Sequence, residues 1–247
     1  MTDNSVPGRR GPGRPKAQPT GPLMDQDRNC QERLLEVAVK AFAVRGYDGV
    51  SLRALAAAAN CDVSMVAHHF GSKQDLWLAT VEHMRERALL YCEEVRVIQQ
   101  SPAPIEARCL QAVEHLFDTM ASEDEMVRFM MRERAEGSAR FELLSARVIA
   151  LLFAAYRPIW QEAIDNGVLK VSDPAAVHTL LSGAIAFLVT SPPFEAHGES
   201  GRGHGRGDND RDVGDEAAKR VDVKQLLRRL FAQLGGDVSR PLNQGNS

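Results

Sequence analysis

The chain has 247 residues, 44% of them hydrophobic and 26% charged, which is an ordinary composition for a soluble protein. Its N-terminus lacks the apolar core of a secretory signal, and its most apolar window, 179–190, falls short of the ~20 residues of a membrane-spanning helix. We therefore expect a cytoplasmic protein with no membrane partner. The net charge is −3, but residues 1–80 hold ten Lys and Arg against eight Asp and Glu, so this end is better suited to an anionic partner.

The four cysteines lie far apart in the sequence, and none belongs to a CxxC pair: Cys30, Cys61, Cys92 and Cys109. This spacing predicts neither a disulfide framework nor a zinc site. Scattered free thiols fit a reducing cytoplasm, and we expect no metal and no other cofactor.

Residues 1–24 are rich in Pro, Gly and Arg and poor in apolar residues. Such a segment cannot bury enough surface to offset the entropy of ordering it, so we expect a flexible basic arm. Over residues 27–45 the apolar residues recur every three or four positions, which predicts an amphipathic helix ended by Gly46.

Two short helices follow, over 52–59 and 63–69. Ser51 is a good N-cap for the first of them and Asp62 for the second. Asn60 lies between them and tolerates the left-handed backbone conformation that a tight turn requires.

The rest of the chain also has a helical pattern, with a long helix over about 73–98. The helical segments after it are about 104–121, 124–136, 140–165, 173–190 and 217–234, with a Gly-rich mobile loop at 195–216. No run shows the alternating pattern of a β-strand, so the predicted fold class is all-α.

Two short helices joined by a tight turn and flanked by longer helices form a helix-turn-helix layout. The major groove of DNA admits one α-helix, so the reading helix must project while its neighbours hold it. We therefore predict an N-terminal three-helix DNA-binding domain over 25–88 and a larger helical domain over 89–236. Residues 237–247 are expected to be a flexible tail. The apolar residues expected to hold the module together are Leu52, Leu55, Ala56, Ala59, Val66 and Phe70.

The run from Glu32 to Leu76 resembles the N-terminal DNA-binding domain of TetR-type transcriptional regulators. The pieces that carry the resemblance are Ala41-Phe42 with Gly46-Tyr47, Ser51-Leu52-Arg53, and His69-Phe70-Gly71-Ser72-Lys73. Two positions depart from the family pattern, Asn60 where glycine is usual and Ala67 where tyrosine is common. The resemblance implies a dimeric, sequence-specific regulator of transcription, usually a repressor that a small molecule releases from its operator.

Carried over by position, Ser51, Arg53 and Lys73 are expected to contact DNA phosphates, because helix N-termini and a lysine there attract anions. His69 is expected to contact the DNA backbone. In an alternative interpretation, the histidines only cover the surface of the module or pack against Phe70. The residues expected to face base edges lie on the third helix: Val63, Ser64, Met65 and His68.

The arm contains Pro12-Gly13-Arg14-Pro15-Lys16, which is similar to the core of an AT-hook. A segment of this kind lies in a narrow minor groove, whose negative potential attracts arginine. The alternative is a tail that only aids solubility. The arm residues expected to bind DNA are Arg9, Arg10, Arg14 and Lys16.

The TetR resemblance implies that the remaining helices dimerise and bind an effector. We expect 140–165 and 173–190 to form the dimer pair, because the small residues Ser182-Gly183-Ala184 allow close helix contact. The stretch 126–140 loosely resembles CerR-type regulators. An apolar or aromatic effector would suit a pocket lined by Met and aromatic side chains, although their helical spacing favours a place in the core for most of them. The pocket candidates are Phe117, Met120, Met126, Phe129, Met130, Phe153, Tyr156 and Trp160.

The sequence also bears on three other kinds of function. The chain has no Gly-rich phosphate loop, HExxH, GxSxG or paired-carboxylate motif, so we expect no enzyme activity. A redox or metal sensor is the alternative function: oxidation of Cys61 in the turn would disturb DNA binding, and His197 and His204 offer metal ligands. The simpler interpretation is that Cys61 is a small residue packed under the turn and that the two histidines belong to an ordinary polar loop. The acidic body argues against a nonspecific architectural DNA binder.

Overall fold

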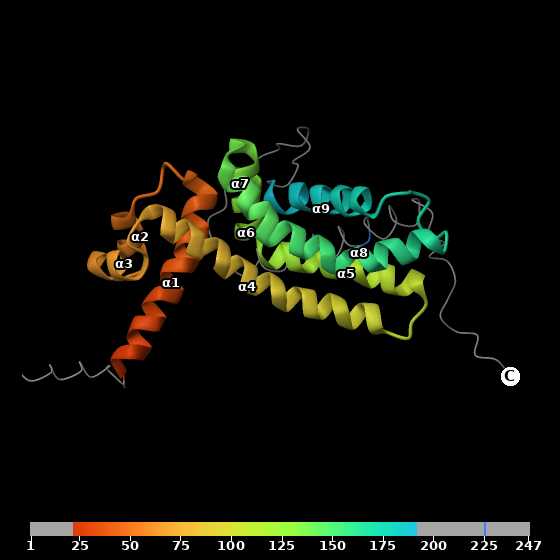
Figure 1. Ribbon diagram of the computed structural model, residues 1–247, viewed down its shortest axis with the longest axis horizontal. Coiled ribbons are helices and arrows are strands. Elements are labelled where there is room, and N and C mark those ends of the chain that lie inside the picture. Colours follow the sequence, from red (N-terminus) through yellow and green to blue (C-terminus); the bar gives the residue numbers. More distant parts are fainter. Residues whose placement is uncertain (1–21, 192–224, 226–247) are drawn as a thin grey trace, which may run out of the picture.

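The computed structural model describes residues 22–191 and residue 225, and every regular element in these residues is a helix (Figure 1). The predicted all-α fold class is therefore confirmed. The elements are α1 (Pro22–Arg45), α2 (Leu52–Ala58), α3 (Val63–Phe70), α4 (Lys73–Gln100), α5 (Ile105–Ser122), α6 (Asp124–Glu136), α7 (Ala139–Leu144), the π-helix η1 (Ser145–Ile149), α8 (Ala150–Asp165) and α9 (Pro174–Thr190).

Most helix ends lie within two residues of the sequence predictions. The exceptions are α1, which begins at Pro22 inside the segment expected to be a flexible arm, and the predicted helix 140–165, which contains the five-residue π-helical stretch η1. The rest of the arm, the loop at 195–216 and the tail lie outside the described residues, as does the predicted helix 217–234 apart from the helical residue 225.

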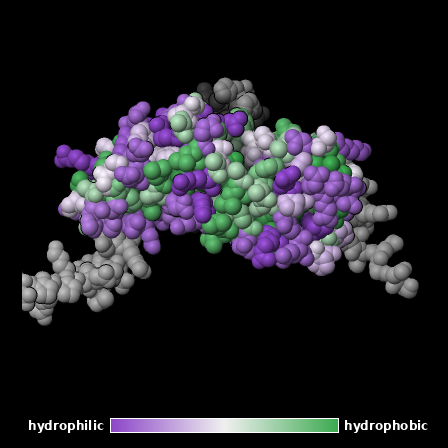
Figure 2. Space-filling view, in the orientation of Figure 1, coloured by the Kyte–Doolittle hydropathy of each residue, from purple (hydrophilic) through white to green (hydrophobic). Residues whose placement is uncertain are grey.

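The helices are arranged along the line of α4 (Figure 1). At one end α1, α2 and α3 gather around the start of α4, and at the other end α5 and α8 lie beside its later turns, with α9 packed on α5 and α8. Figure 2 shows hydrophobic side chains gathered over the middle of the face that α4 crosses, and α4 exposes Leu89, Leu90 and Val97.

Two clusters of buried side chains form the interior. The first joins α1, α2, α3 and the start of α4 to α6, α7 and η1, and it includes Phe42, Trp77 and Phe129. The second lies between the end of α4 and α5, α8 and α9, and it includes Tyr156 and Trp160. Since α4 contributes Ala88 to the first cluster and Val95 to the second, this helix connects the two halves of the molecule.

A buried carboxylate on α6 ties the start of α4 to the body. Glu133 is 1% exposed, and its Oε1 accepts a hydrogen bond of 2.8 Å from Trp77 Nε1. Arg140 on α7 pairs with the same carboxylate, with Nε 3.2 Å from Oε2. A buried charge must be paired and hydrogen-bonded to be tolerated, and both partners are present here.

The expectation of four free cysteines is wrong for two of them. Cys30 on α1 and Cys61 in the turn after α2 form a disulfide, with their Cα atoms 6.1 Å apart. The sequence hides this contact because 31 residues separate the two cysteines and only the packing of the turn on α1 brings them together. Cys92 and Cys109 are free thiols.

The helical stretch Ala139–Asp165 is long and apolar enough to cross a membrane, judged by length and composition alone. From the sequence we expected no apolar stretch as long as a membrane-spanning helix. Within the fold, this stretch contacts α4, α5 and α9, and it buries Tyr156, Ile159, Trp160 and Ala163. These four side chains lie in the second core.

Glu133→Ala is expected to lower the free energy of unfolding by about 2–3 kcal/mol, because Trp77 Nε1 loses its acceptor and Arg140 its buried partner. The matched control is Glu136→Ala, one turn later on α6, where the ion pairs with Arg132 and Arg140 are more exposed and worth less than about 1 kcal/mol. Urea denaturation measures both variants. Equal losses would show that the buried carboxylate has no special role.

Candidate DNA-binding interface

The helix-turn-helix consists of α2, a four-residue turn and α3. Ser51 Oγ accepts a hydrogen bond of 3.1 Å from Ala54 N, and Asp62 Oδ1 accepts one of 2.7 Å from Ser64 N, so both helices begin at capping side chains. Hydrogen bonds from the Ser64 hydroxyl and amide lower the pKa of Asp62, which keeps the α3 cap ionised. Asn60 has a φ of +51°, which is the left-handed conformation expected of it.

The buried face of the module holds α3 against its neighbours. Val66 and Phe70 of α3 and Leu55 and Ala56 of α2 all lie in the first core. The small Ala56 lets α2 pack closely against the neighbouring helices. The first core thereby fixes which side of α3 faces outward.

Arg33 on α1 holds the turn from the other side. Its Nε donates to the backbone oxygen of Ala59 at 3.1 Å, and its Nη2 lies 3.7 Å from Cys61 Sγ. This role of Arg33 could not be predicted from the sequence, because an arginine on an amphipathic helix gives no sign of its partner. Together with Cys30, it makes α1 the support of the turn.

The outward face of α3 carries Val63, Ser64, Ala67 and His68, and Val63 is 44% exposed. Val63 and Ala67, and likewise Ser64 and His68, are spaced one helical turn apart and so lie on one side of α3. This helix lies at one end of the molecule (Figure 1). Ala67 lies in the middle of it, so the departure from the family's tyrosine leaves a small side chain there.

Two of the predicted DNA-contact residues are less exposed to solvent than the outward face of α3. Met65 is half-buried and packs against the first core. His69 is also half-buried, with its ring 6.0 Å from that of Phe70 and 5.5 Å from that of His68. This arrangement agrees with the alternative in which His69 packs against Phe70.

The predicted phosphate contacts lie at the N-termini of α2 and α4. Arg53 is exposed in the first turn of α2, and Ser51 is exposed while its hydroxyl caps that helix. Lys73 begins α4, where its Nζ donates to the backbone oxygen of Asp48 at 3.2 Å and lies 4.7 Å from the centre of the Tyr47 ring. The arm residues Arg9, Arg10, Arg14 and Lys16 lie outside the described residues.

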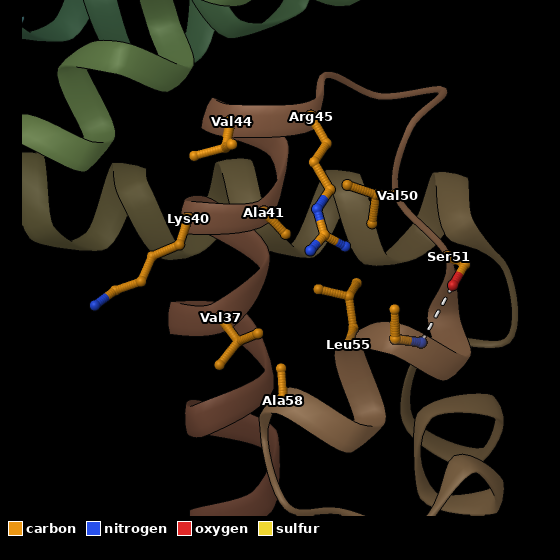
Figure 3. A pocket seen from close by; sticks show the side chains of 10 residues that line it. Val37, Lys40, Ala41, Val44, Arg45, Val50, Ser51, Leu55 and Ala58 are labelled. Atoms are coloured by element: carbon orange, nitrogen blue, oxygen red, sulfur yellow. Dashed lines mark hydrogen bonds between the residues drawn. The ribbon is translucent and has the colours of Figure 1, made fainter.

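An apolar groove of about 380 Å³ lies between α1 and α2 (Figure 3). Val37, Ala41 and Val44 line it from α1 and Leu55 and Ala58 from α2. No residue of α3 lines this groove, so it is separate from the outward face of the third helix.

The predicted effector-pocket residues do not line one common cavity. Met126, Phe129 and Met130 belong to the first core, whereas Phe117, Met120, Tyr156 and Trp160 belong to the second. Phe153 is half-buried, with its ring 5.5 Å from that of His178. An open groove of about 520 Å³ on the body is lined by other residues, all of which carry a polar group: Tyr91, Glu94, Gln111, Glu114, His115, Asp118, Thr119 and Ser122.

A buried histidine lies among the aromatic rings of the body. His178 Nδ1 accepts a hydrogen bond of 3.4 Å from Trp160 Nε1, and the Tyr156 ring is 5.3 Å away. Burial lowers the pKa of His178 to about 4, so this side chain is neutral at pH 7. No group of three His, Cys, Asp or Glu residues in the described part of the chain could hold a metal ion.

Comparison with known proteins agrees with this architecture. The family model for bacterial regulatory proteins of the tetR family matches residues 34–80. The HTH-type transcriptional repressor AcnR of Corynebacterium glutamicum is 26% identical over 180 residues, which cover 71% of this chain and 90% of AcnR. The HTH-type transcriptional regulatory protein RaaS of Mycobacterium tuberculosis is 40% identical over 64 residues, 26% of this chain and 30% of RaaS.

Solved structures show the same fold. A bacterial regulatory protein of the tetR family from Rhodococcus RHA1 superposes with a TM-score of 0.61 at 16% identity, covering 84% of this chain and 97% of that one. The likeness therefore extends over the helical body as well as the helix-turn-helix.

Protonation of the buried His178 should make the stability of the fold depend on pH. His178 takes up a proton near pH 6.5 in the unfolded chain but only near pH 4 in the folded protein, so stability present above pH 6.5 is lost as the pH falls toward 4. The loss reaches about 3 kcal/mol. His178→Gln keeps an acceptor for Trp160 and removes this titration, so its Tm should fall less steeply than that of the wild type between pH 6.5 and 4.5. Parallel curves would contradict this assignment.

Proposed function

The chain belongs to the TetR family of transcriptional regulators, and from that premise we propose that it is a homodimeric repressor released from its operator DNA by a small-molecule effector. The observation that carries the proposal is the outward face of α3, which is held from behind by the first core and presents Val63, Ser64 and His68. A projecting helix of this kind fits the major groove, with Arg53 and Lys73 beside the flanking phosphates.

One short reading helix contacts only a few base pairs, so tight binding needs two half-sites and two copies of the chain. A stripe on α9 that none of residues 22–191 covers supports a second copy at the body. Its exposed residues follow the i, i+3, i+4, i+7 spacing of one helix face, and Leu180 is 68% exposed. The stripe consists of Thr179, Leu180, Gly183, Ala184, Phe187 and Leu188.

The contacts between α1 and α6 offer a route from the body to the DNA. Lys40 pairs with Glu125 at 3.0 Å, and Arg132 Nη1 donates to the backbone oxygen of Val44 at 3.4 Å. A shift of α6 relative to α4 would therefore move α1 and, with it, the helix-turn-helix. In the proposed mechanism the effector favours the body conformation in which the two reading helices are wrongly spaced for adjacent grooves.

The effector itself is proposed as a small molecule bound in the body. An apolar or aromatic effector remains a prediction. It would have to open one of the two cores, since the predicted pocket residues are packed there. We also propose that the arm residues add minor-groove contacts, as their likeness to an AT-hook suggests.

The redox alternative gains support from the Cys30–Cys61 pair, which the sequence analysis did not foresee. For the metal alternative, His197 and His204 lie outside the described residues. We therefore treat oxidation as an additional property of a DNA-binding regulator.

Operator binding is tested with DNA from upstream of the protein's own gene, by fluorescence anisotropy at several salt concentrations with scrambled competitor. Arg53→Ala should weaken binding by about 1 kcal/mol, roughly fivefold, and reduce the slope of log K against log salt by about one unit, because one phosphate contact is lost. The matched control is Lys170→Ala, an exposed cation of the body that should change neither quantity. If scrambled competitor DNA abolishes operator binding by the wild type and by both variants alike, the protein is a nonspecific DNA binder.

The dimer face is tested with Leu180→Asp on α9, which should give a monomer in analytical ultracentrifugation and a large loss of operator affinity, because a charge enters an apolar contact. Val97→Asp on α4 is the matched control, since Val97 is similarly exposed at 65%. A dimer lost in Val97→Asp and kept in Leu180→Asp would place the interface on α4 instead.

A further inference from the structure

The disulfide between Cys30 and Cys61 joins the two parts of the DNA-binding half whose relative position fixes α3. Cys30 lies on α1, and Cys61 directly precedes Asp62, the N-cap of α3. Their Cα separation of 6.1 Å falls within the range that a disulfide spans without backbone movement. The fold therefore brings two distant cysteines into position for a bond.

The two sulfurs differ in exposure and in neighbouring charge, and both differences make Cys61 the more reactive thiol. Cys61 is partly exposed, and the guanidinium of Arg33 lies 3.7 Å from its Sγ. A neighbouring cation stabilises a thiolate, the nucleophilic form of cysteine. Cys30 is only 5% exposed, so an oxidant in solution reaches Cys61 first.

The two remaining cysteines lack these features. Burial raises the pKa of Cys109 to about 12, and burial also raises the pKa of Cys92. Neither thiol is paired. Oxidation should therefore be selective for the pair at the turn.

We propose that Cys30 and Cys61 are a reversible redox site at which a hydroperoxide forms the disulfide and thereby locks α1 to the helix-turn-helix. The Cys61 thiolate attacks the hydroperoxide, the O–O bond breaks, and the products are an alcohol, or water from hydrogen peroxide, and a sulfenic acid on Cys61. The sulfur of Cys30 then attacks that of Cys61 and displaces hydroxide, which leaves as water with the proton of Cys30. Two thiols lose two electrons to the hydroperoxide, and a small dithiol reverses the bond by exchange.

The locked form keeps the arrangement that DNA binding needs. With the disulfide present, both short helices keep their capping hydrogen bonds, Asn60 keeps its left-handed turn, and the outward face of α3 stays exposed. This reverses the direction expected from the sequence, in which oxidation of Cys61 disturbed DNA binding. The oxidised protein should be the more stable one, because the bond closes a 31-residue separation and restricts the unfolded chain.

The test compares the full chain reduced with dithiothreitol and treated with tert-butyl hydroperoxide. Oxidation should lower the mass by about 2 Da per chain, give one cross-linked peptide that joins Cys30 to Cys61, and raise Tm by roughly 5–10 °C. Cys30→Ser and Cys61→Ser should abolish the rise in Tm, and Cys92→Ser should keep it. In Cys30→Ser, dimedone should trap a sulfenic acid on Cys61.

Three results would overturn the proposal: another cysteine pairing, an unchanged Tm in a chain shown to be cross-linked, or loss of operator binding on oxidation alone. Only the last of these rests on the proposed function. A chain that forms the bond and gains stability but binds no operator in either state would count against operator binding and not against the redox site.

Discussion

The packing of Phe42 is the contact on which the rest of the structure depends. This ring of α1 is fully buried, with the Tyr47 ring stacked against it at 6.0 Å and the Phe129 ring of α6 at 5.9 Å on the body side. One side chain thus joins α1 of the DNA-binding half to α6 of the body within the first core. Because interiors are close-packed, α6 cannot shift without α1 shifting too.

Charged groups reinforce the same junction from outside the apolar core. Two cations lie against the Tyr47 ring, with Lys73 Nζ 4.7 Å and the Arg140 guanidinium 4.2 Å from its centre. Arg140 also pairs with Glu133, which holds Trp77 of α4. Lys73 is a proposed phosphate contact, so the chain of neighbours runs from the body to the DNA-facing surface through one tyrosine ring.

The sequence was sufficient where the signal is local. Apolar periodicity predicted the helices, and Ser51, Asn60 and Asp62 predicted the caps and the turn, because each acts on backbone within three residues of itself. It failed where partners are far apart in the chain. Cys30 with Cys61 and Arg33 with Ala59 are brought together only by the crossing of α1 over the turn. The aromatic residues assigned to one pocket were divided between two cores for the same reason.

The two halves of α1 therefore contact different parts of the molecule. Cys30 and Arg33 hold the turn before α3, whereas Phe42 and Lys40 contact α6, about 10–18 Å further along the helix. In the reduced protein, a displacement of α1 by the body reaches α3 through noncovalent contacts that can yield. With the disulfide formed, α1 and the turn move as one unit, so the same displacement is transmitted in full to the reading helix. Oxidation would thus strengthen both the fold of the DNA-binding half and its mechanical link to the body.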